Sequence, residues 1–131
     1  MSDSSGAIGV VVAHGAMAEG LVSAARRIAG ESANGLRALS NDGKSPGQLR
    51  SELEEIAGED LAVVFVDLQA GSCGMAALSC CRDSLRRVVV CGVNLPMLLD
   101  FVFHRDAPLE ELATRLVEKG RAAIVPVGPK Q

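Results

Sequence analysis

The sequence predicts a single α/β domain built on a doubly wound, mainly parallel sheet with helices on both faces. Short apolar runs rich in Val alternate along the chain with segments whose apolar residues recur at helical spacing. Strands that alternate with helices pair in parallel through right-handed crossovers. A length of 131 residues, 48% of them hydrophobic, suits one domain with a substantial core.

The predicted elements follow one another without a linker or an internal repeat. The run of Val at 10–12 and the apolar run at 61–66 are typical of strands buried on both faces. Gly30 and Gly58 suit helix C-caps, and Ser45 before Pro46 suits a helix start. In order, we expect a strand at 9–13, a helix at 17–28, a weak strand at 36–39, a helix at 46–57, a strand at 61–66, a helix at 73–84, a strand at 87–91, helices at 97–103 and 109–119, and a last strand at 122–127.

Three further expectations concern the order of the strands in the sheet, a partner subunit and the N-terminus. We expect the first four strands to lie in the order 2-1-3-4, with the C-terminal strand at an edge because Pro126 lacks a backbone N–H. The helix at 97–103 is apolar almost all round, which is typical of burial on more than one side and suggests a partner subunit. Residues 1–6 are polar and are expected to be disordered, leaving 7–131 as the domain.

Composition excludes several classes of function. A net charge of -3 and a pI of about 5.3 do not favour binding to nucleic acid or a lipid surface. No apolar run approaches the ~20 residues that span a bilayer, and the N-terminus lacks the pattern of a signal peptide. We therefore expect a cytoplasmic protein.

Four cysteines are expected to be free thiols in that compartment. Cys80, Cys81 and Cys91 are interpreted as small buried apolar residues. No Cys-x-x-Cys pair occurs, which argues against a zinc site, and the sequence predicts neither a metal nor a cofactor.

Polar residues at the ends of the first and third strands define the candidate site. His14 and Asp67 each follow a buried strand, and in the order 2-1-3-4 these strands are neighbours at the edge where ligands collect. A carboxylate that accepts from one imidazole nitrogen leaves the other nitrogen free to attack. Gly71 and Ser72 precede a helix whose free N–H groups favour a phosphate, and Gly15 opens the helix on the other side. This combination predicts reversible phosphorylation of His14, with Asp67 as its partner.

These residues resemble a known family. The segments VVVAHGAMAEGL, VFVDLQAGS and GVNLPMLLDF are similar to the IIA domain of the mannose family of the bacterial phosphoenolpyruvate:sugar phosphotransferase system (PTS), and the resemblance runs from about Ile8 to Ile124. It implies that His14 accepts phosphate from the phosphocarrier protein HPr, that Asp67 orients the imidazole, and that Ser72 and its neighbours hold the phosphoryl oxygens. It also implies transfer to a IIB component for sugar uptake, a membrane link only through a permease complex, and a homodimer whose last strand crosses to the partner's sheet.

Departures from the family pattern leave alternatives open. The family loop commonly reads Gly-Gly-Ser-Pro, whereas here it is Ala70-Gly71-Ser72-Cys73. A regulatory phosphorelay, or a binding module read through its phosphorylation state, would use the same histidine. A hydrolase or redox enzyme based on Cys73 is a further alternative, because a thiol at a helix N-terminus has a lowered pKa. It requires Cys73 within hydrogen-bond reach of His14.

Two further residues, one after the other near the end of a predicted helix, are site candidates. His104 is interpreted as a solvated residue at a helix end. Arg105 could approach the same edge of the sheet and assist a phosphate, although nothing in the local sequence requires it.

Overall fold

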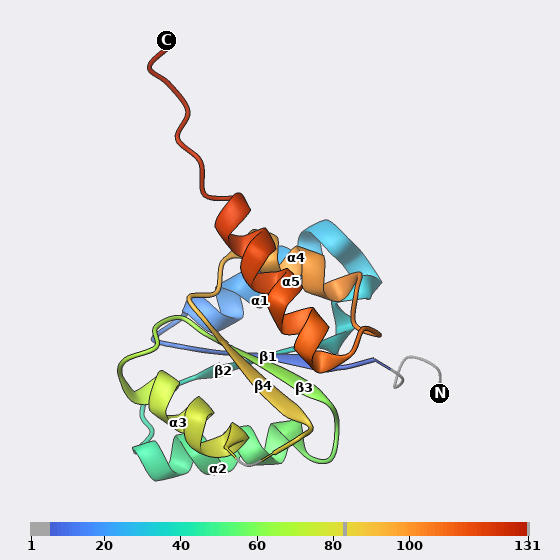
Figure 1. Cartoon of the computed structure of the whole chain (residues 1–131). Coiled ribbons are helices and arrows are strands. Elements are labelled where there is room, and N and C mark those ends of the chain that lie inside the picture. The colour runs from blue at the N-terminus through green and yellow to red at the C-terminus, as the bar shows by residue number, and fades with distance from the viewer. Residues whose placement is uncertain (1–5, 83, 131) are drawn as a thin grey trace.

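The structure, a computed structural model, describes residues 6–82 and 84–130 and has three layers. Helices α2 and α3 cover one face of a central sheet, and α1, α4 and α5 cover the other (Figure 1). The elements are β1 Ile8–Ala13, α1 Met17–Ala29, η2 Gly30–Gly35, β2 Leu36–Ser40, α2 Pro46–Ala57, β3 Ala62–Val66, α3 Ser72–Cys81, β4 Arg87–Cys91, α4 Leu95–Val102 and α5 Leu109–Ala122. The predicted fold class is confirmed.

The sheet has the predicted order β2-β1-β3-β4, and all three strand pairs are parallel. Along the central pair, Val12 of β1 lies beside Val66 of β3. Both strands then end within two residues, so their carboxyl ends meet at one edge of the sheet. The residues that follow them, His14 and Asp67, are neighbours for this reason.

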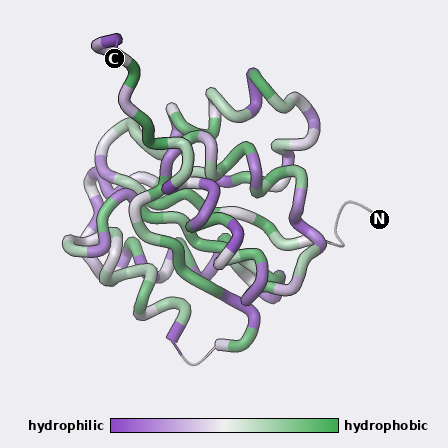
Figure 2. The backbone as a smooth tube through the Cα atoms, turned by 45° about the horizontal axis from the view of Figure 1, so that its top comes forward, coloured by the Kyte–Doolittle hydropathy of each residue, from purple (hydrophilic) through white to green (hydrophobic). Residues whose placement is uncertain are grey.

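Each face of the sheet has its own hydrophobic core, because side chains alternate along a strand. Val11 and Phe65 face α1, α4 and α5, whereas Val10, Val12 and Val64 face α2 and α3. In Figure 2 the hydrophobic colour is concentrated along the strands and the segments packed on them. The two central strands are buried on both faces, as their continuous Val runs predict.

Helix α4 is covered mainly by its own chain. Leu98 and Phe101 are fully buried, and the ring of Phe101 packs edge-on against Phe65 at a centroid distance of 5.3 Å. Phe103, directly after the helix, remains 61% exposed. The apolar character of this segment therefore reflects the core of one subunit, and it does not by itself require a partner.

The predicted last strand at 122–127 is not formed within this chain. Ala122 is still part of α5, and the following residues project away from the body of the domain (Figure 1). Ile124, Val125 and Val127 are 75%, 65% and 93% exposed. The prediction was wrong for the single chain because an extended segment needs a neighbouring strand to satisfy its backbone groups, and this tail leaves the sheet.

Other local differences are smaller. Residues 30–35 form a 3-10 helix, where the sequence predicts no helix or strand, and α3 ends at Cys81 rather than near Ser84. Cys80 is buried as expected, but Cys81 is only half-buried and Cys91 is exposed, so the prediction was wrong for Cys91. Residues 1–5 of the expected disordered start lie outside the described residues. Within the described ranges, no helix has the length and hydrophobicity needed to cross a membrane.

We predict that Gly9→Ala destabilises the domain. A Cβ atom on Gly9 would lie 2.7 Å from Cε2 of Phe101 and 2.9 Å from Cδ2 of Leu36, inside the packed core. Overpacking of this kind costs roughly 1–3 kcal/mol. The matched control is Gly20→Ala on the exposed surface of α1, where a Cβ meets nothing within 4 Å and should stabilise the helix by about 1 kcal/mol. Urea unfolding measures both, and equal effects of the two substitutions would contradict the packing of β1 against α4.

Candidate functional site

His14 leaves the sheet directly after β1, and its side chain is 43% exposed. Gly15 then turns the chain with a φ of 61°, a left-handed conformation that favours glycine, before α1 begins at Met17. The backbone N–H of Met17 donates to the carbonyl of His14, which closes this turn. The imidazole therefore stands on a short, fixed connection between a buried strand and a helix.

Asp67 holds His14 at two points. Oδ2 of Asp67 accepts a hydrogen bond from the backbone N–H of His14 at 2.9 Å and lies 2.8 Å from its ring nitrogen Nδ1. The second carboxylate oxygen accepts from the backbone N–H of Leu68 at 2.9 Å. An ionised carboxylate only accepts, so its contact with the ring assigns a proton to Nδ1 and leaves the Nε2 lone pair available. The structure thus brings together the two residues on which the sequence prediction depended.

The electrostatics of this contact favour the ionised carboxylate. Burial of Asp67 would raise its pKa, but the hydrogen bonds from the backbone and side chain of His14, together with that from Leu68, outweigh burial. The pKa of Asp67 is therefore held below its ordinary value of 3.8.

Gly71 and Ser72 lie at the start of α3, and Gly71 is beside the edge of the imidazole formed by Cε1 and Nε2. Gly71 is the N-cap, with a φ of 100°, and a Cβ there would be 3.7 Å from Cε1 of His14. Helix α3 begins at Ser72, one residue earlier than predicted, and the first N–H groups of a helix lack helical acceptors. Gly74 lets this turn pack closely, because a Cβ there would overlap the carbonyl oxygen of Gln69. The helix start is thus fixed beside the ring.

Asn41, which the sequence pattern did not indicate as a site residue, joins the two sides of the site. Its Oδ1 accepts from the backbone N–H of Gly15 at 3.2 Å, and its Nδ2 donates to Oγ of Ser72 at 3.4 Å. Ser40, at the end of β2, donates to the carbonyl of Gly15 at 2.8 Å. The signal that could have indicated Ser40 and Asn41 as site residues was their position at the carboxyl end of β2, the strand next to β1.

Cys73 also reaches the imidazole, as the thiol-based alternative requires. Its Sγ lies 3.8 Å from Nδ1 of His14, and the residue is fully buried. Burial and the nearby charge of Asp67 raise the pKa of this thiol, so the expectation of a lowered pKa at a helix N-terminus was wrong. In a nucleophile–His–Asp triad, the nucleophile and the carboxylate use different ring nitrogens. Here both groups approach Nδ1, which argues against a Cys73-based hydrolase.

Arg105 and His104 lie elsewhere. Nε of Arg105 donates to the carbonyl of Ala7, at the amino end of β1, so the idea that Arg105 approaches the site is wrong. A six-residue strand, about 20 Å long, separates that end from His14. His104 follows α4, where its Nδ1 lies 2.8 Å from the carbonyl oxygen of Asp100.

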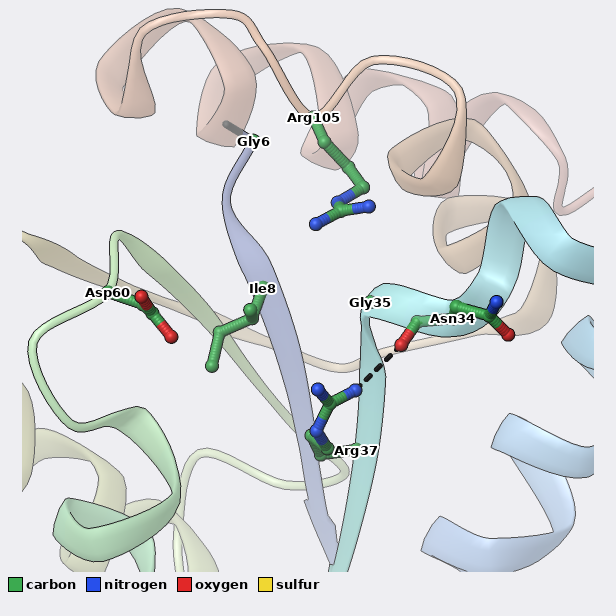
Figure 3. A pocket seen from close by; sticks show the side chains of 7 residues that line it. All are labelled: Gly6, Ile8, Asn34, Gly35, Arg37, Asp60 and Arg105. Carbon is green, nitrogen blue, oxygen red and sulfur yellow. Dashed lines mark hydrogen bonds between the residues drawn. The ribbon is translucent and has the colours of Figure 1, made fainter. Parts of the chain in front are cut away.

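A hollow of about 220 Å³ occupies this opposite edge of the sheet (Figure 3). The guanidinium groups of Arg37 and Arg105 extend toward it, and Asp60 lies across from them. Arg37 is engaged by the carbonyl of Asn34 at 2.7 Å. The hollow contains none of the residues around His14.

Comparison with known families identifies the chain. The sequence model described as PTS system fructose IIA component (EIIA-man) matches residues 9–117. The chain belongs to this family. As a IIA component it is part of the phosphotransferase system, and the matched range contains His14, Asp67 and the loop between β3 and α3. A comparison with curated proteins gave no match.

Solved structures share the fold of this IIA component. The mannose/sorbose specific IIA subunit from Enterococcus faecalis is 23% identical with a TM-score of 0.85, and the alignment covers 96% of this chain and 98% of that chain. The component EIIA from Streptococcus agalactiae is 22% identical with a TM-score of 0.84, covering 91% and 95%. A sigma-54 interaction domain protein from Enterococcus faecalis is 12% identical with a TM-score of 0.73, covering 91% and 93%.

The Asp67 contact predicts a defined pH dependence of stability. Because the folded pKa of Asp67 lies below the ordinary 3.8, ionised Asp67 stabilises the IIA domain above that pH. This stabilisation is lost as the pH falls through 3.8 and then through the lower folded value. The free energy of unfolding of the wild type should exceed that of Asp67→Asn at neutral pH, and the difference should shrink below about pH 4. Urea unfolding at several pH values measures it. A difference that stays constant down to the acid range would contradict the assigned contact.

Proposed function

We propose that this IIA domain is a phosphohistidine carrier. His14 would accept a phosphoryl group from phospho-HPr and pass it to a IIB component, in the cytoplasm, for sugar uptake or PTS-linked regulation. The observation that carries the proposal is the contact between Asp67 and Nδ1 of His14. This contact leaves Nε2 as the nucleophilic nitrogen of an exposed imidazole that lies beside the start of α3.

The chemical step needs few protein groups. The Nε2 lone pair of His14 attacks phosphorus, a P–N bond forms, and the P–N bond to the histidine of HPr breaks. The ring of His14 becomes cationic while Nδ1 keeps its proton, and the ionised carboxylate of Asp67 stabilises that charge. Transfer to the next carrier is the same step in reverse.

The developing negative charge on the phosphoryl oxygens would be met by the first turn of α3. Backbone N–H groups at this helix start point toward an anion, and the helix dipole adds to their effect. Ser72 would contribute its hydroxyl, held in place by Asn41. Gly15 and Gly71 would let the donor approach, because no side chain stands at either position.

The surroundings of His14 suit docking of a protein carrier. Met17, Leu68 and Met75 are 43%, 57% and 69% exposed, and each lies within three residues of a proposed site residue. Exposed large apolar side chains gathered around a polar centre are typical of protein interfaces. We propose that HPr and the IIB component use this surface in turn.

The C-terminal tail supports a proposed homodimer. Its exposed apolar residues need cover, and β4 lies at an edge of the sheet with unpaired backbone groups. Residues 124–127 would pair with β4 of a second copy as an added strand. This pairing would bury the apolar side chains of the tail and would supply hydrogen-bond partners to the backbone of β4.

We predict that His14 is the phosphorylated residue. Intact-mass analysis after incubation with phosphoenolpyruvate, enzyme I and HPr should show an acid-labile gain of one phosphate. His14→Ala should show none, because the nucleophile is lost, whereas His104→Ala, the matched control at the other histidine, should gain phosphate as the wild type does. Subsequent addition of IIB proteins from the same cell should discharge the phosphate.

Each result separates the alternatives. Absence of the mass gain with HPr from the same organism would overturn the carrier function. A gain that survives in His14→Ala would place the phosphate elsewhere. A phosphorylated form that no IIB protein discharges would favour the binding module read through its phosphorylation state.

We also predict that the tail holds the dimer together. Removal of residues 124–131 deletes three exposed apolar side chains, and burial of two of them contributes roughly 3–6 kcal/mol. The dimer dissociation constant should therefore rise at least about 100-fold. Removal of residues 129–131 alone is the matched control and should leave it unchanged. Sedimentation equilibrium measures the dissociation constants of both deletion variants. A wild type that remains monomeric, or a dimer unaffected by the longer deletion, would contradict the pairing of the tail with a second copy.

A further inference from the structure

Three chemically different groups that can bind a metal converge at the candidate site. Nδ1 of His14, a carboxylate oxygen of Asp67 and Sγ of Cys73 all lie within 4.8 Å of one another. They come from the end of β1, the end of β3 and the first turn of α3. No spacing motif in the sequence links them, which is why the absence of Cys-x-x-Cys argued against a zinc site.

The separations between these atoms approach those of a tetrahedral metal centre. Zn²⁺ binds nitrogen and oxygen at about 2.0–2.2 Å and thiolate sulfur at about 2.3 Å, which places neighbouring ligand atoms about 3.3–3.6 Å apart. In the structure Nδ1 is 2.8 Å from Oδ2 of Asp67 and 3.8 Å from Sγ of Cys73. Adjustments of about half an ångström bring these two pairs to the metal geometry. The third pair, a carboxylate oxygen of Asp67 and Sγ of Cys73, lies within 4.8 Å and would close to about 3.6 Å around the metal.

We propose that His14, Asp67 and Cys73 form a chelating site for a soft divalent metal ion, Zn²⁺ in the first place, and that occupancy of the site switches off phosphorylation. The combination of imidazole, thiolate and carboxylate favours zinc over magnesium or calcium, which prefer oxygen ligands alone. The inhibition rests on the proposed carrier function, whereas the binding does not.

The local structure fixes two of the three ligands in advance. Asp67 is held by the backbone N–H groups of His14 and Leu68. Cys73 is carried on α3, whose close approach to Gln69 depends on Gly74. The His14 side chain is 43% exposed, and we expect water to complete the tetrahedron as the fourth ligand. Three protein ligands and one open position are typical of accessible zinc sites.

Metal binding at Nδ1 changes the protonation of the ring. The thiol proton of Cys73 leaves to solvent, because only the thiolate binds the metal. The Nδ1 proton is displaced and Nε2 carries the proton of the neutral ring. Nε2 then has no lone pair to attack phosphorus. The metal and the phosphoryl group therefore exclude each other even though they use opposite nitrogens of His14.

Titration of the unphosphorylated protein with Co²⁺, a spectroscopic substitute for Zn²⁺, tests the binding. We expect a near-ultraviolet thiolate-to-cobalt charge-transfer band at one equivalent, and its displacement by Zn²⁺. Cys73→Ser should abolish the band. His14→Ala changes an exposed side chain and should weaken binding at least about 100-fold, since loss of even an outer partner of a metal ligand costs about 10- to 100-fold.

Cys91→Ser is the matched control, because it removes an exposed thiol outside the cluster. It should leave the band and the affinity unchanged. Absence of the band in the wild type, or its survival at full strength in Cys73→Ser with the same affinity, would overturn the proposal. Binding unaffected by His14→Ala would do so too, independently of whether Cys73→Ser folds.

Phosphorylation by purified phospho-HPr tests the inhibition. Zn²⁺ at the concentration that saturates the site should lower the rate for the wild type and for Cys91→Ser at least about tenfold relative to their metal-free rates. Cys73→Ser should show much less inhibition in the same mixture. A saturated site with an undiminished rate would overturn the inhibition. A chain that binds Co²⁺ but takes no phosphate without metal would instead count against the carrier function.

Discussion

The carboxylate of Asp67 joins the ends of the two central strands, and the rest of the site depends on this contact. Its Oδ2 accepts a hydrogen bond from the backbone N–H of His14 and contacts the ring nitrogen Nδ1 of the same residue. The direction of the main chain and the orientation of the imidazole are therefore set together. The contact forms because β1 and β3 are parallel neighbours whose carboxyl ends lie side by side. The order β2-β1-β3-β4 is therefore a chemical as well as an architectural feature.

Most of the architecture was predictable from the sequence. The buried strands at 10–12 and 61–66 needed only their continuous apolar character, and Ser45 and Pro46 indicated a helix start that the structure shows as a complete capping box. The meeting of His14 with Asp67 followed from the handedness of crossovers once the strand order was assumed. These properties depend on local pattern and on general rules of chain topology.

The features that sequence reasoning missed depend on tertiary contacts. Asn41 became part of the site only because β2 lies next to β1. The pKa of Cys73 was expected to fall from its place on a helix, but it rises because the thiol is buried beside an anion. Arg105 follows α4 in sequence, yet its backbone and side chain pair with Ala7 at the far end of β1. The tail at 124–127 has the composition of a strand but leaves the sheet of its own chain.

The backbone hydrogen bond to Asp67 has a consequence for how this fold can change over time. Because the main-chain N–H of residue 14 donates to Oδ2, the carboxylate keeps this donor whatever residue other than proline stands at position 14. The backbone shape of this edge of the sheet and the reactivity of the imidazole are thus separable properties. A descendant of such a chain could exchange its histidine for another residue and keep the same backbone surface at this edge of the sheet, without the proposed carrier chemistry.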